Sequence, residues 1–418
     1  MDKFYTNFIY LIIIKGTNFV FPYLLTVPYL ARTLGEGKFG KIAFTVGFMS
    51  FFIAFVEYGF NLTATRDLTI HKDNPQKVNE VYNTVLACKL VLFAISVLVA
   101  LVVIFSFKFF RDDYLLYVSS LLLVLGQALL PIWFFQGVNN LKPMAIINLG
   151  INIIVFGVMF LVVKTTADYL FVNIIQGLGW ILASFICMII AKKQYNLCFY
   201  SQKWQTLWAE LKVSFGIFTT NFLHFSFLTA NLFMVGLFVE GKALDEYSYS
   251  DKIYMMLRTF AGIIYVVVYP KVSNLFLFSP EKVNSFLLKI SGLIAIIFFS
   301  FSSFIFIFAS EILLLLSGQN SEKSILLLKI IAFAPFLYAM SVPISQKMLV
   351  SNNEKKLSII LIFTILFNLC INLILLPLYH EIGGAISLLL TEGFFLALGS
   401  LCLPFLSDKR LKSVKITN

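Results

Sequence analysis

Long apolar runs alternate with short polar connectors along the whole of this chain. A helix needs about 20 apolar residues to cross the hydrocarbon core of a bilayer. Twelve windows of about that size (~20 residues) are present, and each predicts a transmembrane helix: 8–31, 42–64, 82–107, 114–136, 144–163, 169–191, 213–238, 250–271, 284–309, 325–349, 357–378 and 382–405. The pattern therefore predicts an all-α polytopic membrane protein.

Composition supports the same class. The 418 residues are 60% hydrophobic and 13% charged, whereas an ordinary globular domain is about 45–50% apolar and about 25% charged. The longest connector is Lys192–Lys212, so no extramembrane domain remains for separate catalytic machinery. A membrane polymerase or ligase needs such a domain, and we therefore expect a protein that is not an enzyme.

The basic residues indicate topology and not a nucleic-acid partner. The net charge is +11, but Lys and Arg are scattered through the connectors and form no stripe on a soluble domain. The connectors that share a side with the N-terminus carry seventeen of them, and those on the opposite side carry nine. The positive-inside bias predicts that both termini are cytoplasmic.

The sequence contains no motif that calls for a cofactor. The five cysteines are odd in number and far apart, which indicates neither a disulfide framework nor a metal site. A Gly-x-x-x-x-Gly-Lys-Ser/Thr loop is absent, which excludes ATP hydrolysis by the P-loop route. We expect no cofactor, and the sequence does not indicate whether H+ or Na+ serves as a coupling ion.

The two halves of the chain repeat each other. Asn74–Asn79 matches Ser279–Asn284 at an offset of 205, and Thr17–Phe19 matches Thr220–Phe222 at an offset of 203. Because each half has an even number of spans, both enter the membrane in the same orientation, which predicts parallel repeats related by a pseudo-twofold axis. The predicted parts are two six-helix lobes, 1–195 and 213–405, a cytoplasmic connecting strap, 196–212, and a basic cytoplasmic tail, 406–418.

Trp204 and Trp208 lie four residues apart in the predicted strap. This spacing is compatible with a short interfacial amphipathic helix, and an ordinary loop is the alternative.

Four segments resemble a known family: Val27–Phe44, Glu57–Arg66, Pro131–Gly137 and Leu376–Ala385. They are similar to the polysaccharide-transport branch of the MOP (multidrug/oligosaccharidyl-lipid/polysaccharide) exporter superfamily, which is MATE-like and includes the Wzx-type O-antigen and capsule repeat-unit flippases. The resemblance implies a V-shaped two-lobe helical fold with a central cavity.

The resemblance also implies a substrate, an undecaprenyl-pyrophosphate-linked oligosaccharide that moves from the inner to the outer leaflet of the bacterial cytoplasmic membrane. Membrane lipid, a repeat-unit polymerase and a chain-length regulator are the further partners that it suggests for a monomeric transporter. A MATE-type cation or drug antiporter and a lipid II flippase are the alternatives. An antiporter is expected to carry cavity carboxylates in the first span, where this chain has Lys15.

Ionisable residues inside apolar runs are the candidate site residues, because each is costly in a membrane. Arg258 lies inside the eighth span, and its planar guanidinium suits phosphate oxygens. Lys15 and Glu57 lie at similar depths in the first two spans. They form an ion pair between neighbouring helices, or Lys15 faces a cavity and attracts the pyrophosphate; both interpretations stay open.

Glu392 lies near the middle of the last span, and the repeat places neutral Gln176 opposite it. At that depth the carboxylate is paired with a cation such as Arg258, protonated, or alternating between these states as a coupling site. Three further candidates have a plainer interpretation: Lys89 and Lys289 as lysines that snorkel to the interface, and His224 as a hydrogen-bonded helix contact.

Overall fold

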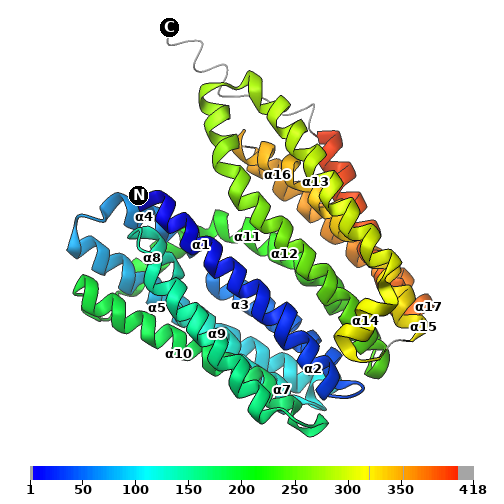
Figure 1. Cartoon of the computed structure of the whole chain (residues 1–418). Coiled ribbons are helices and arrows are strands. Elements are labelled where there is room, and N and C mark those ends of the chain that lie inside the picture. Colours follow the sequence, from blue (N-terminus) through cyan, green and yellow to red (C-terminus); the bar gives the residue numbers. More distant parts are fainter. Residues whose placement is uncertain (1–2, 320, 352, 403–418) are drawn as a thin grey trace. The chain divides into compact units, whose positions relative to one another are not determined.

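The computed structural model describes residues 3–319, 321–351 and 353–402, and in these ranges the chain is helical with no strand (Figure 1). This confirms the predicted all-α class. The end of the last predicted span, 403–405, and the predicted tail, 406–418, lie outside the described residues. The chain divides into two compact units, Met1–Thr229 and Ala230–Asn418.

The first unit contains the first six predicted spans. Its helices are α1 (Lys3–Phe19), a π-helical segment (Val20–Thr26), α2 (Val27–Thr33), α3 (Lys38–Glu57), α4 (Phe60–His71), α5 (Pro75–Ser106), α6 (Lys108–Arg111), α7 (Tyr114–Leu129), α8 (Ile132–Gly137), α9 (Lys142–Val162), a 3-10 turn (Thr166–Asp168) and α10 (Tyr169–Tyr195). Helix α10 packs against both α7 and α9 (Figure 1).

The second unit begins inside α11 (Trp204–Phe238). The later helices are α12 (Gly241–Phe278), α13 (Glu281–Ile307), α14 (Ala309–Ser317), α15 (Glu322–Ile331), α16 (Ala334–Val350) and α17 (Glu354–Cys402). Helix α16 packs against α12, α13 and α17.

The span count agrees with the sequence pattern. Ten helices of the described chain are long and apolar enough to cross a membrane. One of these, α17, is two helices joined at His380, whose φ of 50° breaks the helix. The segment Lys3–Thr33 is a further span that is divided into three short helical pieces. Counting both gives twelve.

The predicted strap 196–212 differs from what the structure shows. Its second half, from Trp204, belongs to α11, so only residues 196–203 connect α10 to the next helix. Trp204 and Trp208 are 62% and 61% exposed on one face of that helix. Their spacing therefore marks a helix, but one that continues directly into the seventh span.

The repeated motif opens a helix in each unit. Asn74 caps α5, where its side chain accepts from the backbone N–H groups of Gln76 (3.1 Å) and Lys77 (3.2 Å), and Pro75 occupies the first turn. Ser279 and Pro280 also precede a helix, α13, but there Pro280 is itself the N-cap residue and no side chain caps the helix. This motif therefore has a local structural role.

Small residues bring α7 and α10 close together. A Cβ atom on Gly126 would lie 2.6 Å from Trp180 Cβ, and one on Gly177 would lie 2.6 Å from Leu122 Cβ. Ser184 adds a hydrogen bond of 3.0 Å to the carbonyl of Gly126. Close backbone approach at small residues is how membrane helices gain packing energy.

We predict that Gly126→Ala lowers stability by about 1–3 kcal/mol, because the added methyl group overpacks this contact. The matched control is Gly150→Ala on α9, where a Cβ atom would meet nothing within 4 Å. Melting temperatures of the purified variants in detergent measure both effects. Equal melting temperatures for the two variants would show that the contact is not tight.

Candidate functional site

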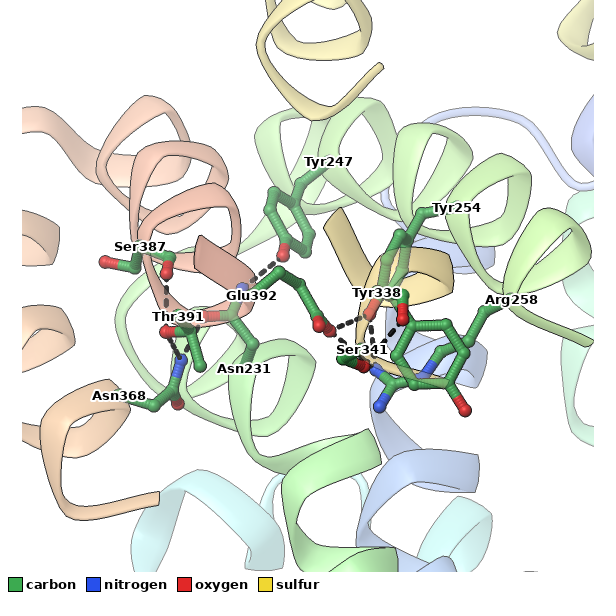
Figure 2. Close-up of polar contacts among 10 residues, drawn as sticks. All are labelled: Asn231, Tyr247, Tyr254, Arg258, Tyr338, Ser341, Asn368, Ser387, Thr391 and Glu392. Carbon is green, nitrogen blue, oxygen red and sulfur yellow. Dashed lines mark hydrogen bonds and ion pairs between the residues drawn. The ribbon is translucent and has the colours of Figure 1, made fainter. Parts of the chain in front are cut away.

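Three helices of the second unit place charged and phenolic side chains together (Figure 2). Tyr254 and Arg258 are four residues apart on α12 and so share one face of that helix. Glu392 comes from the part of α17 that follows the break at His380, and Tyr338 comes from α16. We call these four residues the Arg258 cluster.

One carboxylate oxygen organises the cluster. Glu392 Oε1 accepts a hydrogen bond from Arg258 Nη1 at 3.0 Å and another from the hydroxyl of Tyr254 (Figure 2). Arg258 also donates to the Tyr254 hydroxyl. The guanidinium carbon lies 4.1 Å from the centroid of the Tyr338 ring, which is a cation–π contact.

The pair is deeply buried. Arg258 is 4% exposed and Glu392 is 1% exposed, and both belong to spans. Charges removed from water are tolerated when each is hydrogen-bonded to the other, because the desolvation cost is otherwise several kcal/mol per ion. The second carboxylate oxygen, Glu392 Oε2, has no hydrogen-bond partner among the described residues. The carboxylate thus keeps one acceptor unused.

A second polar group, the asparagine network, adjoins the cluster through the peptide bond between Thr391 and Glu392 (Figure 2). Asn231 Oδ1 accepts from the amides of Asn368 and Asn372, both at 2.9 Å. Asn231 itself donates to the carbonyl of Gly384 at 3.0 Å, and Asn368 donates to Thr391 Oγ1 at 2.9 Å. The network fastens α11 to both parts of α17.

The other predicted site residues are distributed over the chain. Lys15 is exposed on α1. Glu57, at the end of α3, hydrogen-bonds the Asn61 side chain and interacts electrostatically with Lys89 first and with Lys15 more weakly. Neither lysine forms an ion pair with Glu57 in the described residues, and Lys89 is the stronger electrostatic neighbour.

Lys89 departs from its plainer interpretation. It is 3% exposed and does not snorkel to an interface, since its ammonium donates to the carbonyls of Gln127 and Leu130. Lys289 on α13 and His224 on α11 are exposed, and Gln176 on α10 is half-buried. Gln176 and His224 belong to the first unit, and Lys289 lies on α13, which is not one of the three helices that carry the Arg258 cluster.

Sequence reasoning missed Tyr338 and the asparagine network. Asn368 and Asn372 carried a signal, because amides four residues apart inside an apolar run lie on one helix face and need partners there. It also missed the ion pairs Lys41–Asp113 in the first unit and Lys323–Glu381 in the second. Those partners are far apart in the sequence, and no periodic pattern links them.

The fold is that of membrane transporters. An inward-facing multidrug resistance MATE family transporter of the MOP superfamily matches with a TM-score of 0.66 at 14% identity, over 97% of this chain and 95% of that chain. The lipid II flippase MurJ, in an inward closed conformation, matches with a TM-score of 0.66 at 16% identity, over 95% and 87%. At these identities the likeness concerns the fold alone.

The chain belongs to the family described as "Polysaccharide biosynthesis protein", which matches residues 4–276. A curated relative from Escherichia coli (strain K12), named "Putative O-antigen transporter", is 28% identical over 406 residues, which is 97% of each chain. The resemblance drawn from the four sequence segments is thereby confirmed.

We predict that Arg258→Met and Glu392→Met are each destabilising by about 3–5 kcal/mol, because each leaves the other member of the pair as an unpaired charge in the helix bundle. The double variant Arg258→Met/Glu392→Met should recover most of the loss. A double-mutant cycle on melting temperatures in detergent measures the coupling. Additive losses would mean that the two side chains do not depend on each other.

Proposed function

We propose that this chain is a flippase that moves a polyprenyl-pyrophosphate-linked oligosaccharide repeat unit from the inner to the outer leaflet of the bacterial cytoplasmic membrane. The supporting observation is the end-to-end similarity to the E. coli relative named for O-antigen transport. Membership in a polysaccharide biosynthesis family and a transporter fold agree with this substrate class. The product serves assembly of O-antigen, capsule or exopolysaccharide.

In this proposal the chain translocates its substrate and makes or breaks no covalent bond. It works as a multi-pass monomer with both termini in the cytoplasm, an orientation supported by the bias of Lys and Arg between the connectors. A repeat-unit polymerase and a chain-length regulator act on the exported unit.

We assign pyrophosphate recognition to Arg258. Its guanidinium offers parallel N–H groups that match phosphate oxygens, and Tyr338 and Tyr254 hold its orientation. In the structure the guanidinium of Arg258 is paired with the carboxylate of Glu392. The pyrophosphate therefore takes the place of an internal anion, so Arg258 is never left as an unpaired buried charge. Lys15, exposed on α1, is the second cation of the proposal.

We predict that Arg258→Ala abolishes surface polysaccharide in a strain that lacks its chromosomal copy of the gene, while the variant stays in the membrane. Lys282→Ala is the matched control, because Lys282 is an exposed cation in the same unit. Immunoblots of surface polysaccharide and extraction of the lipid-linked repeat unit are the measurements. The repeat unit should accumulate with Arg258→Ala only.

The variant Arg258→Met/Glu392→Met separates recognition from folding, because it removes both charges together. It should be stable and still fail to export. Normal export by this double variant would refute the role of Arg258. Uptake of a fluorescent cation into proteoliposomes under a pH gradient would instead favour a drug antiporter.

A further inference from the structure

Lys89 has no part in the Arg258 cluster, yet it is a buried cation in the first unit. It projects from α5 and is 3% exposed. Its Nζ atom lies 2.8 Å from the carbonyl oxygen of Gln127 and 3.4 Å from that of Leu130. These carbonyls belong to the end of α7 and the residue that follows it.

Pro131 explains why the Gln127 carbonyl needs a donor. In an α-helix this carbonyl would accept from the N–H of the residue four positions later, which is Pro131, and proline has no N–H. Leu130 leaves the helical conformation with a ψ of 115°. Lipid offers no donor to an orphaned carbonyl, so the lysine ammonium replaces the missing N–H. Its charge also suits the negative end of a helix.

A second break lies in the neighbouring span. Helix α3 ends at Glu57, and α4 begins at Phe60 after two left-handed residues, Tyr58 (φ 45°) and Gly59 (φ 79°). Glu57 is the carboxylate with which Lys89 interacts electrostatically. Lys89 therefore hydrogen-bonds the break after α7 and lies within electrostatic range of Glu57 at the break after α3.

Beyond the breaks, α4 and α8 form one packed pair. Thr65 Oγ1 donates to the carbonyl of Trp133 at 3.1 Å, and a Cβ atom on Gly137 would lie 2.6 Å from Leu68 Cβ. Before the breaks, α3 packs against α7. Figure 1 shows α4 and α8 at the end of the unit that carries the N-terminus, with α2 at the opposite end.

We propose that Tyr58–Gly59 and Leu130–Pro131 form a hinge about which α4 and α8 move together, and that Lys89 is the positioning residue that holds the hinge. The lysine supplies the donor that Pro131 lacks. Its hydrogen bonds to the carbonyls of Gln127 and Leu130 therefore fix the geometry of the break after α7. A role of this motion in transport rests on the proposed function. The existence of the hinge does not depend on that function.

The second unit lacks this device in its described residues. Its fourth span bends between α15 and α16, but Ala332 (φ −50°) and Phe333 (φ −93°) keep right-handed helical angles there. The offset of 205 places Ile294, an apolar residue that is 2% exposed, opposite Lys89. The hinge is therefore a property of the first unit.

A double-mutant cycle with Lys89→Met and Pro131→Ala tests the replacement of the backbone donor. We expect Lys89→Met alone to lower the melting temperature of the full chain in detergent by roughly 3–10 °C, since a buried carbonyl loses its partner. Pro131→Ala restores the N–H group, so in its background the same Lys89→Met change should cost less than half as much. Equal losses in both backgrounds would overturn the assignment of Lys89.

Distances between spin labels test the motion. Labels replace exposed Ile70 on α4 and exposed Leu115 on α7, and the control pair replaces Ile153 on α9 and Phe185 on α10. The five native cysteines are first substituted. In nanodiscs, we expect Lys89→Met to broaden the distribution of distances between the labels at 70 and 115, and Pro131→Ala to narrow it. Neither variant should change the distances of the control pair.

An unchanged 70–115 distribution in Pro131→Ala would overturn the hinge even if Lys89→Met failed to fold. Export of surface polysaccharide, measured on the same variants, keeps the two proposals distinct. If Pro131→Ala narrows the 70–115 distance distribution but exports normally, the hinge exists but is not needed for transport. If the losses in melting temperature are additive and the distances are unchanged, the hinge proposal is refuted. Normal export by the same variants would then leave the flippase proposal intact.

Discussion

The ion pair between Arg258 and Glu392 is the interaction on which the interior of the second unit depends. It ties α12 to the last part of α17, and through Tyr338 it reaches α16. Lipid cannot solvate either charge, so each must be satisfied inside the chain. The asparagine network beside it meets the same constraint with neutral amides. Helix positions in this unit therefore follow from a small number of polar contacts.

The first unit solves the same problem by a different chemistry. Lys89, a buried cation of this unit, donates to the backbone carbonyls of Gln127 and Leu130, and Pro131 has left the first of these without its helical donor. The repeat places Ile294 opposite Lys89, Gln176 opposite Glu392 and Ala54 opposite Arg258, so these charges are not duplicated. The two halves thus share a helical scaffold but differ in their charges. The second half carries the Arg258–Glu392 pair, in which an external anion can replace the carboxylate, and the first half carries a helix break that Lys89 stabilises.

The sequence predicted the spans, because each requires a run of apolar residues that can be counted. It also placed Arg258 and Glu392 as possible partners, since charges at membrane depth are few. It could not predict that Tyr254 and Tyr338 would complete the cluster, because this chain has 18 tyrosines and most need no partner. Lys89 was interpreted as an interfacial lysine because the carbonyls that bind it, 38 and 41 residues away, leave no trace in a linear pattern.

Transport of a lipid-linked oligosaccharide by the purified chain is the central claim. It is tested most directly in proteoliposomes that contain only this protein and a fluorescent polyprenyl-pyrophosphate-linked oligosaccharide, with a membrane-impermeant quencher reporting the leaflet. The account predicts that the protected fraction changes with time in vesicles that hold the protein and stays constant in protein-free vesicles. Equal protected fractions in both, with the protein folded and an H+ or Na+ gradient applied, would contradict it.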